Sequence, residues 1–179
     1  MKMGHEELQP VTKLSSDLGQ LDILIAVPGL PFSGKTFDQQ SLGGSESAGH
    51  YIAKALARRG HRVTVFCSVT ERVHCEDVDY LPITMFQQYA SLSQHDVCIV
   101  QRLPELFPAN CRARFSALWC HDLAVGRSAE KILGTAWNFD KVFVLSEFMR
   151  EQYKGVYGLP DEVLHLTRNG VDLACVKTV

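Results

Sequence analysis

The chain has 179 residues, of which 46% are hydrophobic and 21% are charged. This composition is that of an ordinary globular protein, and the chain is long enough to bury a core without disulfides or metal ions. Its 18 Lys and Arg residues against 20 Asp and Glu residues give a net charge of -2, which excludes the strongly basic surface of a nucleic-acid-binding protein.

The first 20 residues form a polar extension that lacks the apolar stretch of a secretory signal. The longest apolar run, residues 21–30, contains Asp22 and Pro28 and is far shorter than a membrane span. The six cysteines have no CxxC spacing, so we expect reduced thiols and no metal site. These features predict a cytoplasmic protein with no transmembrane segment, no nucleic-acid partner and no cofactor.

Strand-like and helix-like stretches alternate from residue 21 onward. The strand-like runs are continuously apolar, as expected for parallel strands covered on both faces, and comprise 21–27, 63–67, 80–84, 96–101, 117–120, 141–145 and 163–167. The helical stretches comprise 46–59, 85–93, 128–137 and 146–153. This alternation predicts one doubly wound α/β domain over residues 21–173. We expect a mostly parallel sheet of six or seven strands with 21–27 at its centre.

The helix expected over 46–59 has the clearest pattern. One apolar stripe repeats at helical spacing along it, formed by Ala48, Ile52, Ala55 and Leu56. Ser45 is placed to act as its N-cap, and Glu46 lies in the first turn, where the helix dipole favours an acid. Gly60 follows the helix as a stop signal.

The loop before this helix contains two candidate phosphate-binding motifs. Residues Gly29–Thr36 match G-x-x-x-x-G-K-[ST] after an apolar strand, which in a P-loop would place Lys35 on phosphates and Thr36 on Mg²⁺. A P-loop needs a long helix opening at Gly34, and here Gly43-Gly44 interrupts the chain first. The Gly43–Glu46 segment has the better context, because glycines without Cβ lead into a long helix whose N–H groups can approach an anion.

Four segments in register resemble the N-terminal, Rossmann-like domain of a family 4, GT-B glycosyltransferase. They are the Gly-Gly-Ser-Glu loop with its helix and Arg-Gly-His turn in 42–67, FSALWCHDL at 115–123, DKVFVLSEFM at 140–149 and PDEVLHLTRNGVDL at 160–173. The resemblance implies transfer of a sugar from a nucleotide-sugar, which is a substrate and not a cofactor, to a glycan, lipid or small-molecule acceptor. It implies a retaining, metal-independent reaction.

In that family the nucleotide is held chiefly by a C-terminal domain, so residues 174–179 are expected to begin the link to such a domain. This chain alone is therefore expected to be inactive.

The resemblance also assigns roles to residues of this chain. His121 is expected beside the reacting sugar carbon as the catalytic residue. The expected substrate-binding residues are Gly43, Gly44, Ser45, Glu46, Arg102, Asp122, Ser146 and Asn169. Asp122 is a candidate to orient His121 or to cap the following segment, Ser146 to cap a helix at the same sheet edge, and Asn169 to act as a hinge.

Two other functions stay open at this point. One is a P-loop nucleotide-binding protein that uses Gly29–Thr36. The other is a non-catalytic Rossmann binding module, which a large exposed apolar face would support.

Overall fold

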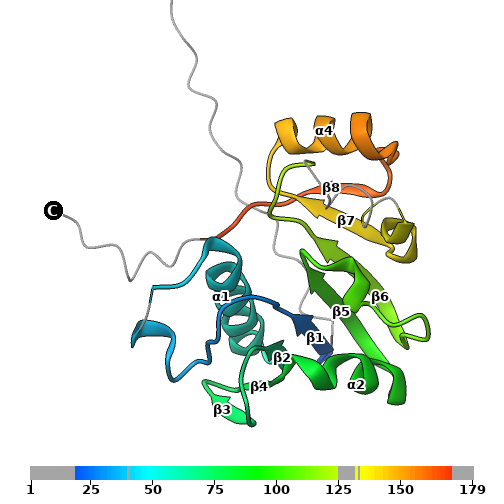
Figure 1. Ribbon diagram of the computed structural model, residues 1–179. Helices are drawn as coiled ribbons and strands as arrows, with labels where there is room; N and C mark the ends of the chain where they lie inside the picture. The colour runs from blue at the N-terminus through cyan, green and yellow to red at the C-terminus, as the bar shows by residue number, and fades with distance from the viewer. Residues whose placement is uncertain (1–18, 40, 125–131, 133, 171–179) are drawn as a thin grey trace, which may run out of the picture.

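A computed structural model describes residues 19–39, 41–124, 132 and 134–170. Within these residues the chain forms one sheet with the strand order β3-β4-β2-β1-β5-β6-β7-β8 (Figure 1). The strands are β1 (Asp22–Ala26), β2 (Arg62–Cys67), β3 (Val73–Cys75), β4 (Val78–Pro82), β5 (His95–Gln101), β6 (Ala113–Trp119), β7 (Lys141–Val144) and β8 (Leu164–Leu166). All neighbouring pairs are parallel except β3 and β4. The predicted doubly wound, mostly parallel sheet with β1 at its centre is confirmed.

The sequence missed the edge strand β3, which makes the described sheet eight-stranded instead of seven-stranded. β3 pairs antiparallel with β4 across a two-residue turn, with Cys75 opposite Val78. The two turn residues, Glu76 and Asp77, have φ angles of 50° and 61°. A turn with positive φ at both central positions usually contains Asn or Gly, so the acidic pair gave no hairpin signal.

The helices are α1 (Gly44–Arg58), α2 (Phe86–Leu92) and α4 (Glu147–Tyr157), with 3-10 helices η1 (Phe37–Gln39), η2 (Ile83–Met85), η3 (Pro104–Leu106) and η4 (Ala136–Asn138). Some boundaries differ from the expected ones. β4 begins two residues before 80, β6 begins at Ala113 instead of 117, and α4 continues to Tyr157. Half of the helix expected over 128–137 lies outside the described residues, and its last two residues belong to η4.

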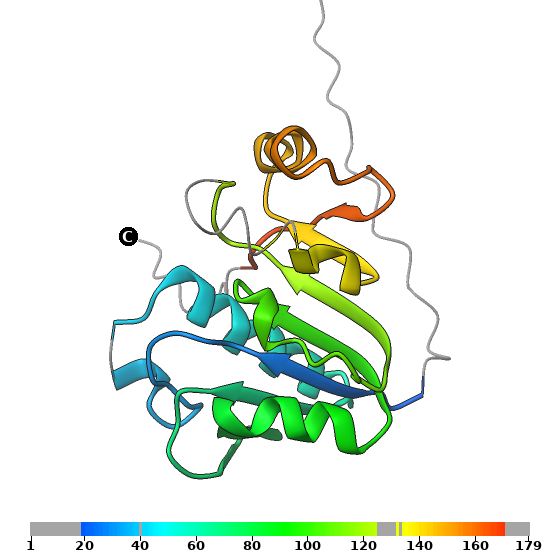
Figure 2. The ribbon, with the colours of Figure 1, turned by 45° about the vertical axis from the view of Figure 1, so that its right-hand side comes forward.

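The sheet separates two hydrophobic cores. The side chains of β1 alternate between them: Leu24 and Ala26 pack with α2 and α4, whereas Ile23 and Ile25 pack with α1. Figure 2 shows α1 on the opposite side of the sheet from α2 and α4. Helices on both faces explain why the strands read as continuous apolar runs.

Helix α1 packs closely on the sheet at Gly49. A Cβ atom on Gly49 would lie 2.7 Å from Cγ2 of Val27 and 3.3 Å from Nε2 of Gln101. A contact of 2.7 Å is too short for two carbon atoms, so α1 can lie this close to the sheet only because residue 49 is a glycine.

We expect Gly49→Ala to lower the free energy of unfolding by about 1–3 kcal/mol, the usual cost of overpacking a core. The matched control is Gly155→Ala on α4, because a Cβ there meets nothing within 4 Å. That change should leave stability equal or raise it by up to about 1 kcal/mol through helix propensity. Urea unfolding followed by circular dichroism measures both, and equal midpoints would contradict the close packing at Gly49.

Candidate functional site

A polar cavity of about 400 Å³ lies at the carboxyl ends of the central strands, where open parallel sheets bind ligands. It is formed by the start of α1, the ends of β5 and β6, the residue after β7 and the segment after β8. Its lining residues are Gly43, Gly44, Ser45, Glu46, Arg102, His121, Asp122, Leu145 and Asn169. The structure thus brings together all of the expected site residues except Ser146, and it adds Leu145, which sequence reasoning did not single out.

The carboxylate of Glu46 is buried at one wall of the cavity, where the residue is only 4% exposed. Oε1 accepts a hydrogen bond from the Leu30 backbone N–H at 3.0 Å, and Oε2 accepts one from the Ser45 hydroxyl at 2.9 Å. Burial opposes ionisation, but the hydrogen bonds and the nearby Arg102 charge outweigh it and hold the pKa of Glu46 below its usual value. Glu46 is therefore an ionised residue that ties the first loop to α1.

Two glycines leave the space that this carboxylate fills. A Cβ on Gly29, whose φ is +143°, would lie 2.1 Å from Oε1 of Glu46, and a Cβ on Gly43 would lie 2.5 Å from Oε2. A Cβ on Gly44 would meet nothing within 4 Å. Gly29 and Gly43 thus make room for the Glu46 carboxylate. Of these three glycines, only Gly44 lines the cavity with free space beside its Cα atom.

The predicted N-cap role of Ser45 is wrong. Helix α1 begins at Gly44, and its N-cap is Gly43 in an extended conformation with φ -70° and ψ 165°. The Gly43 carbonyl accepts the N–H of Ser47 at 3.1 Å. Ser45 is the second residue of the helix, and its hydroxyl donates to the Glu46 carboxylate instead of capping the helix.

The Gly29–Thr36 segment does not have P-loop geometry. No helix begins at Gly34, since residues 34–36 form a turn, η1 follows, and α1 starts only at Gly44. The Thr36 hydroxyl oxygen accepts the Ser33 N–H at 3.0 Å. A Cβ on Gly34 would lie 2.8 Å from Cβ of Cys75, so this loop is packed against β3.

His121 follows β6 and borders the cavity with a half-buried imidazole. Its ring centroid lies 4.8 Å from that of Trp119. Burial lowers the pKa of His121 to about 4, with the Arg102 charge acting in the same direction and Asp122 and Glu46 opposing it. The imidazole is therefore neutral near pH 7, with one nitrogen that donates and one that accepts a hydrogen bond.

Arg102 and Asp122 form an ion pair across the cavity mouth. Nε of Arg102 donates to Oδ2 of Asp122 at 2.8 Å, and the side chains are 37% and 56% exposed. Arg102 has φ 60°, an uncommon backbone conformation for a residue with a side chain. The hydroxyl of Tyr153 donates to the Asp122 carbonyl at 2.9 Å. Among the described residues the Asp122 carboxylate contacts Arg102 and makes no hydrogen bond to His121. Its other considered role, capping the following segment, concerns residues that lie largely outside the described ones.

Ser146 and Asn169 have different positions. Ser146 is the N-cap of α4, where its Oγ accepts the Met149 N–H at 3.2 Å, and it does not line the cavity. The capping role considered for Ser146 is present, and its expected role in binding stays a prediction. Asn169 is exposed and closes the cavity from the segment after β8.

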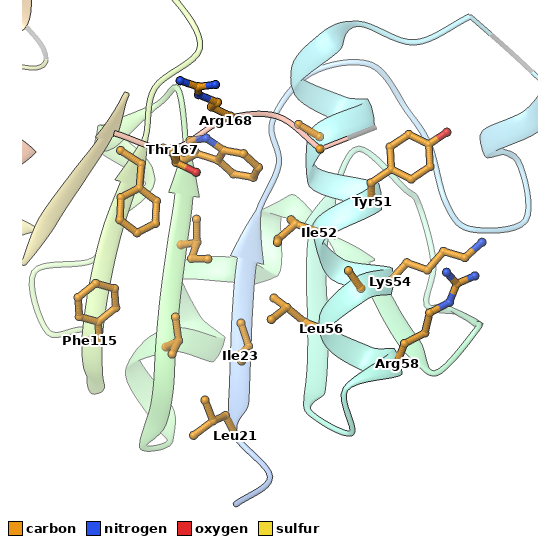
Figure 3. Close-up of a pocket in the computed structure, with 17 residues that line it drawn as sticks. Leu21, Ile23, Tyr51, Ile52, Lys54, Leu56, Arg58, Phe115, Thr167 and Arg168 are labelled. Atoms are coloured by element: carbon orange, nitrogen blue, oxygen red, sulfur yellow. The ribbon is translucent and has the colours of Figure 1, made fainter. Parts of the chain in front are cut away.

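A larger, apolar groove of about 550 Å³ lies beside α1 on the face of the sheet opposite α2 and α4. Figure 3 shows Ile52 and Leu56 pointing from α1 toward the strands, with Leu21, Ile23 and Phe115 along the floor. Sequence reasoning did not find this groove. Its apolar lining offers few partners for hydroxyl-rich or charged ligands, so group-transfer chemistry fits the polar cavity better.

Among the described residues, no cluster of three or more His, Cys, Asp or Glu side chains is arranged to hold a metal ion. No helix in this part of the chain has the length and apolar character needed to cross a membrane.

In comparison with protein families, the chain matches the model of Glycosyltransferase Family 4 over residues 42–174. The match begins directly before Gly43 and includes every residue that lines the polar cavity. Among curated proteins, no match is found.

The lowered pKa of Glu46 makes stability depend on pH. Because the folded pKa lies below the unfolded value of 4.5, the stabilisation is fully present above that value and is lost as the pH falls through the folded pKa. At pH 7 we expect Glu46→Gln to cost about 1–2 kcal/mol, since hydrogen bonds to a charged acceptor are stronger than those to an amide.

Denaturant unfolding of both proteins between pH 7 and pH 3 checks this, and the difference should shrink below about pH 4.5. Glu71→Gln is the control, because Glu71 is exposed. A difference that stays constant over the whole range would show that Glu46 is not ionised in the folded protein.

Proposed function

The chain belongs to glycosyltransferase family 4, and from that membership we propose that its polar cavity binds hydroxyl groups of the transferred sugar or the acceptor beside His121. The reaction proposed is transfer from a nucleotide-sugar in a GT-B enzyme, with retention of the anomeric configuration. The donor diphosphate is held chiefly by groups other than those of this cavity.

The charge balance of the cavity carries this proposal. Arg102 is the one cation among the lining residues, and it is already paired with Asp122 at 2.8 Å. Glu46 adds a second carboxylate, and His121 is neutral near pH 7. A cavity with one paired cation and two carboxylates repels a diphosphate, whereas hydroxyl groups can donate to its carboxylates and accept from its N–H groups.

The start of α1 supports the same division of roles. A helix N-terminus attracts anions through its free N–H groups and its dipole. Here the Glu46 carboxylate lies in that first turn and supplies the negative charge internally. The backbone at Gly44 is left with N–H groups that suit a neutral oxygen better than a second full anion.

His121 can then act by position. A neutral imidazole contributes one hydrogen bond to a sugar hydroxyl and neither gains nor loses a proton near pH 7. Such a contact speeds the reaction to the extent that it strengthens in the transition state.

On this proposal the chain alone binds nucleotide-sugars at about millimolar affinity or more weakly, because 1 mM already requires about 4.1 kcal/mol.

The two alternatives differ in their support. The P-loop alternative has lost its geometric basis at Gly34. The non-catalytic binding module has one observation in its favour, the apolar groove beside α1. Titration with sugars separates it from the leading proposal, because a groove-based binding module has no reason to recognise a glycoside at His121.

We expect simple methyl glycosides to shift the backbone amide NMR signals of the cavity residues, and to do so selectively around His121. His121→Ala should weaken this binding by about two- to tenfold, the equivalent of one hydrogen bond of about 0.5–1.5 kcal/mol. His74→Ala is the control, because His74 pairs with Asp79 on the β3–β4 hairpin. Shifts confined to the apolar groove, or none in the cavity with any glycoside, would overturn the proposed function.

Removing one carboxylate from the cavity should strengthen the binding of an anionic ligand. Asp122→Asn frees Arg102, so calorimetry at low salt should show UDP-sugar binding tightened by about two- to fivefold, since exposed charge pairs are worth about 0.2–1 kcal/mol. Asp161→Asn is the control, because Asp161 pairs with Arg150 and Lys154 at α4. Micromolar binding by the unmodified chain would place the diphosphate site in this cavity after all.

A further inference from the structure

Three neighbouring side chains beneath the cavity have polar atoms without hydrogen-bond partners. Gln101 is 0% exposed and Trp119 is 6% exposed. Within the described part of the chain, Oε1 and Nε2 of Gln101, Nε1 of Trp119 and Nε2 of His121 are all buried and all unpaired. Buried polar groups are nearly always hydrogen-bonded, so four such atoms in adjacent residues require an explanation.

The strand register brings these side chains together. Gln101 and Trp119 are directly opposite each other on the parallel strands β5 and β6, so their side chains share the α1 face of the sheet. The Trp119 ring lies 4.8 Å from the His121 ring. Gly49 of α1 covers Gln101, since a Cβ there would lie 3.3 Å from its Nε2. Each of the four unpaired atoms is buried, although the Trp119 side chain also lines the apolar groove and His121 lines the polar cavity.

We propose that Gln101, Trp119 and His121 form a binding site for one internal water molecule that fixes the tautomer of His121. Buried waters occupy such positions, typically with two to four polar partners. The four unpaired atoms offer that number of partners, and each of them is itself buried.

The donors and acceptors around this water determine its orientation. The indole Nε1–H and the amide Nε2–H₂ can only donate, so they use both lone pairs of the water oxygen. Both water hydrogens then donate, one to Oε1 of Gln101 and one to Nε2 of His121. Nε2 must therefore be the unprotonated nitrogen, and Nδ1 carries the proton.

This assignment gives Gln101 and Trp119 a function beyond packing. They are positioning residues that leave His121 with a defined N–H donor at Nδ1 for the cavity. The lowered pKa of His121 agrees, because it keeps the imidazole neutral near pH 7, with one donor and one acceptor nitrogen. The inference concerns the residue used in the proposed function, but its test needs no donor sugar or acceptor, so either can fail without the other.

NMR of the whole chain labelled with ¹⁵N-histidine tests the tautomer. His121→Gln identifies the His121 signals among those of the seven histidines. At pH 7 we expect Nδ1 to appear as the protonated nitrogen and Nε2 as a hydrogen-bonded, unprotonated one. The Nε2–H tautomer, or rapid exchange between the two tautomers, would overturn the proposal.

The water itself is detected by magnetisation transfer to the indole protons. We expect a signal from a long-lived water at the Trp119 indole N–H and none at Trp137, which is 58% exposed and serves as the internal control. Absence of that signal at Trp119 contradicts the site, and this measurement uses the unmodified protein.

Variants then connect the water to His121. Gln101→Leu and Trp119→Phe each remove hydrogen-bonding partners of the water and substitute an apolar side chain. In each variant His121 should no longer be held in a single tautomer. Gln88→Leu on the exposed face of α2 is the matched control and should leave the His121 signals unchanged. If either folded variant keeps the Nδ1–H tautomer unchanged, these residues do not position His121. If Gln101→Leu does not fold, Trp119→Phe and the unmodified protein still decide the question.

Discussion

The buried carboxylate of Glu46 is the interaction on which the rest of the site depends. It accepts hydrogen bonds from Leu30 in the first loop and from Ser45 in α1, and it fills the space left by two glycines. This one group therefore sets where α1 begins relative to β1. Since α1 covers the central strands, the same contact determines how the cavity wall faces His121.

The site is consequently built around charges that the protein supplies to itself. The helix start receives its anion from Glu46, and Arg102 receives its counter-ion from Asp122. His121 stays neutral because burial disfavours its charged form. A cavity balanced in this way can bind a ligand through directed hydrogen bonds while offering little attraction to a phosphate group. In the function proposed above, recognition of hydroxyl groups would thus be separate from neutralisation of the leaving group.

Much of the fold could be predicted because parallel strands covered on both faces leave a strong local signal. The continuous apolar runs identified β1, β2, β5 and β7 nearly to the residue. β3 left no such signal, since it is three residues long and its turn uses Glu76 and Asp77 at positive φ. All residues of the cavity except Leu145 were found, but the reason for Gly43 was not, because the carboxylate of Glu46 fills the space beside it only in the folded structure. Gln101 and Trp119 could not be found from sequence, because only the register of β5 with β6 makes them neighbours.

The space shared by Gly29, Gly43 and Glu46 has a consequence for how this sequence can vary. Any Cβ at position 29 or 43 overlaps the carboxylate, so a larger residue at either glycine is compatible only with a shorter side chain at position 46. Conversely, once residue 46 is shortened, Gly43 loses its steric reason to stay, whereas Gly29 is still favoured by its φ of +143°. Positions 43 and 46 are therefore coupled, and among related sequences they should change together, as correlated substitutions three residues apart along the chain.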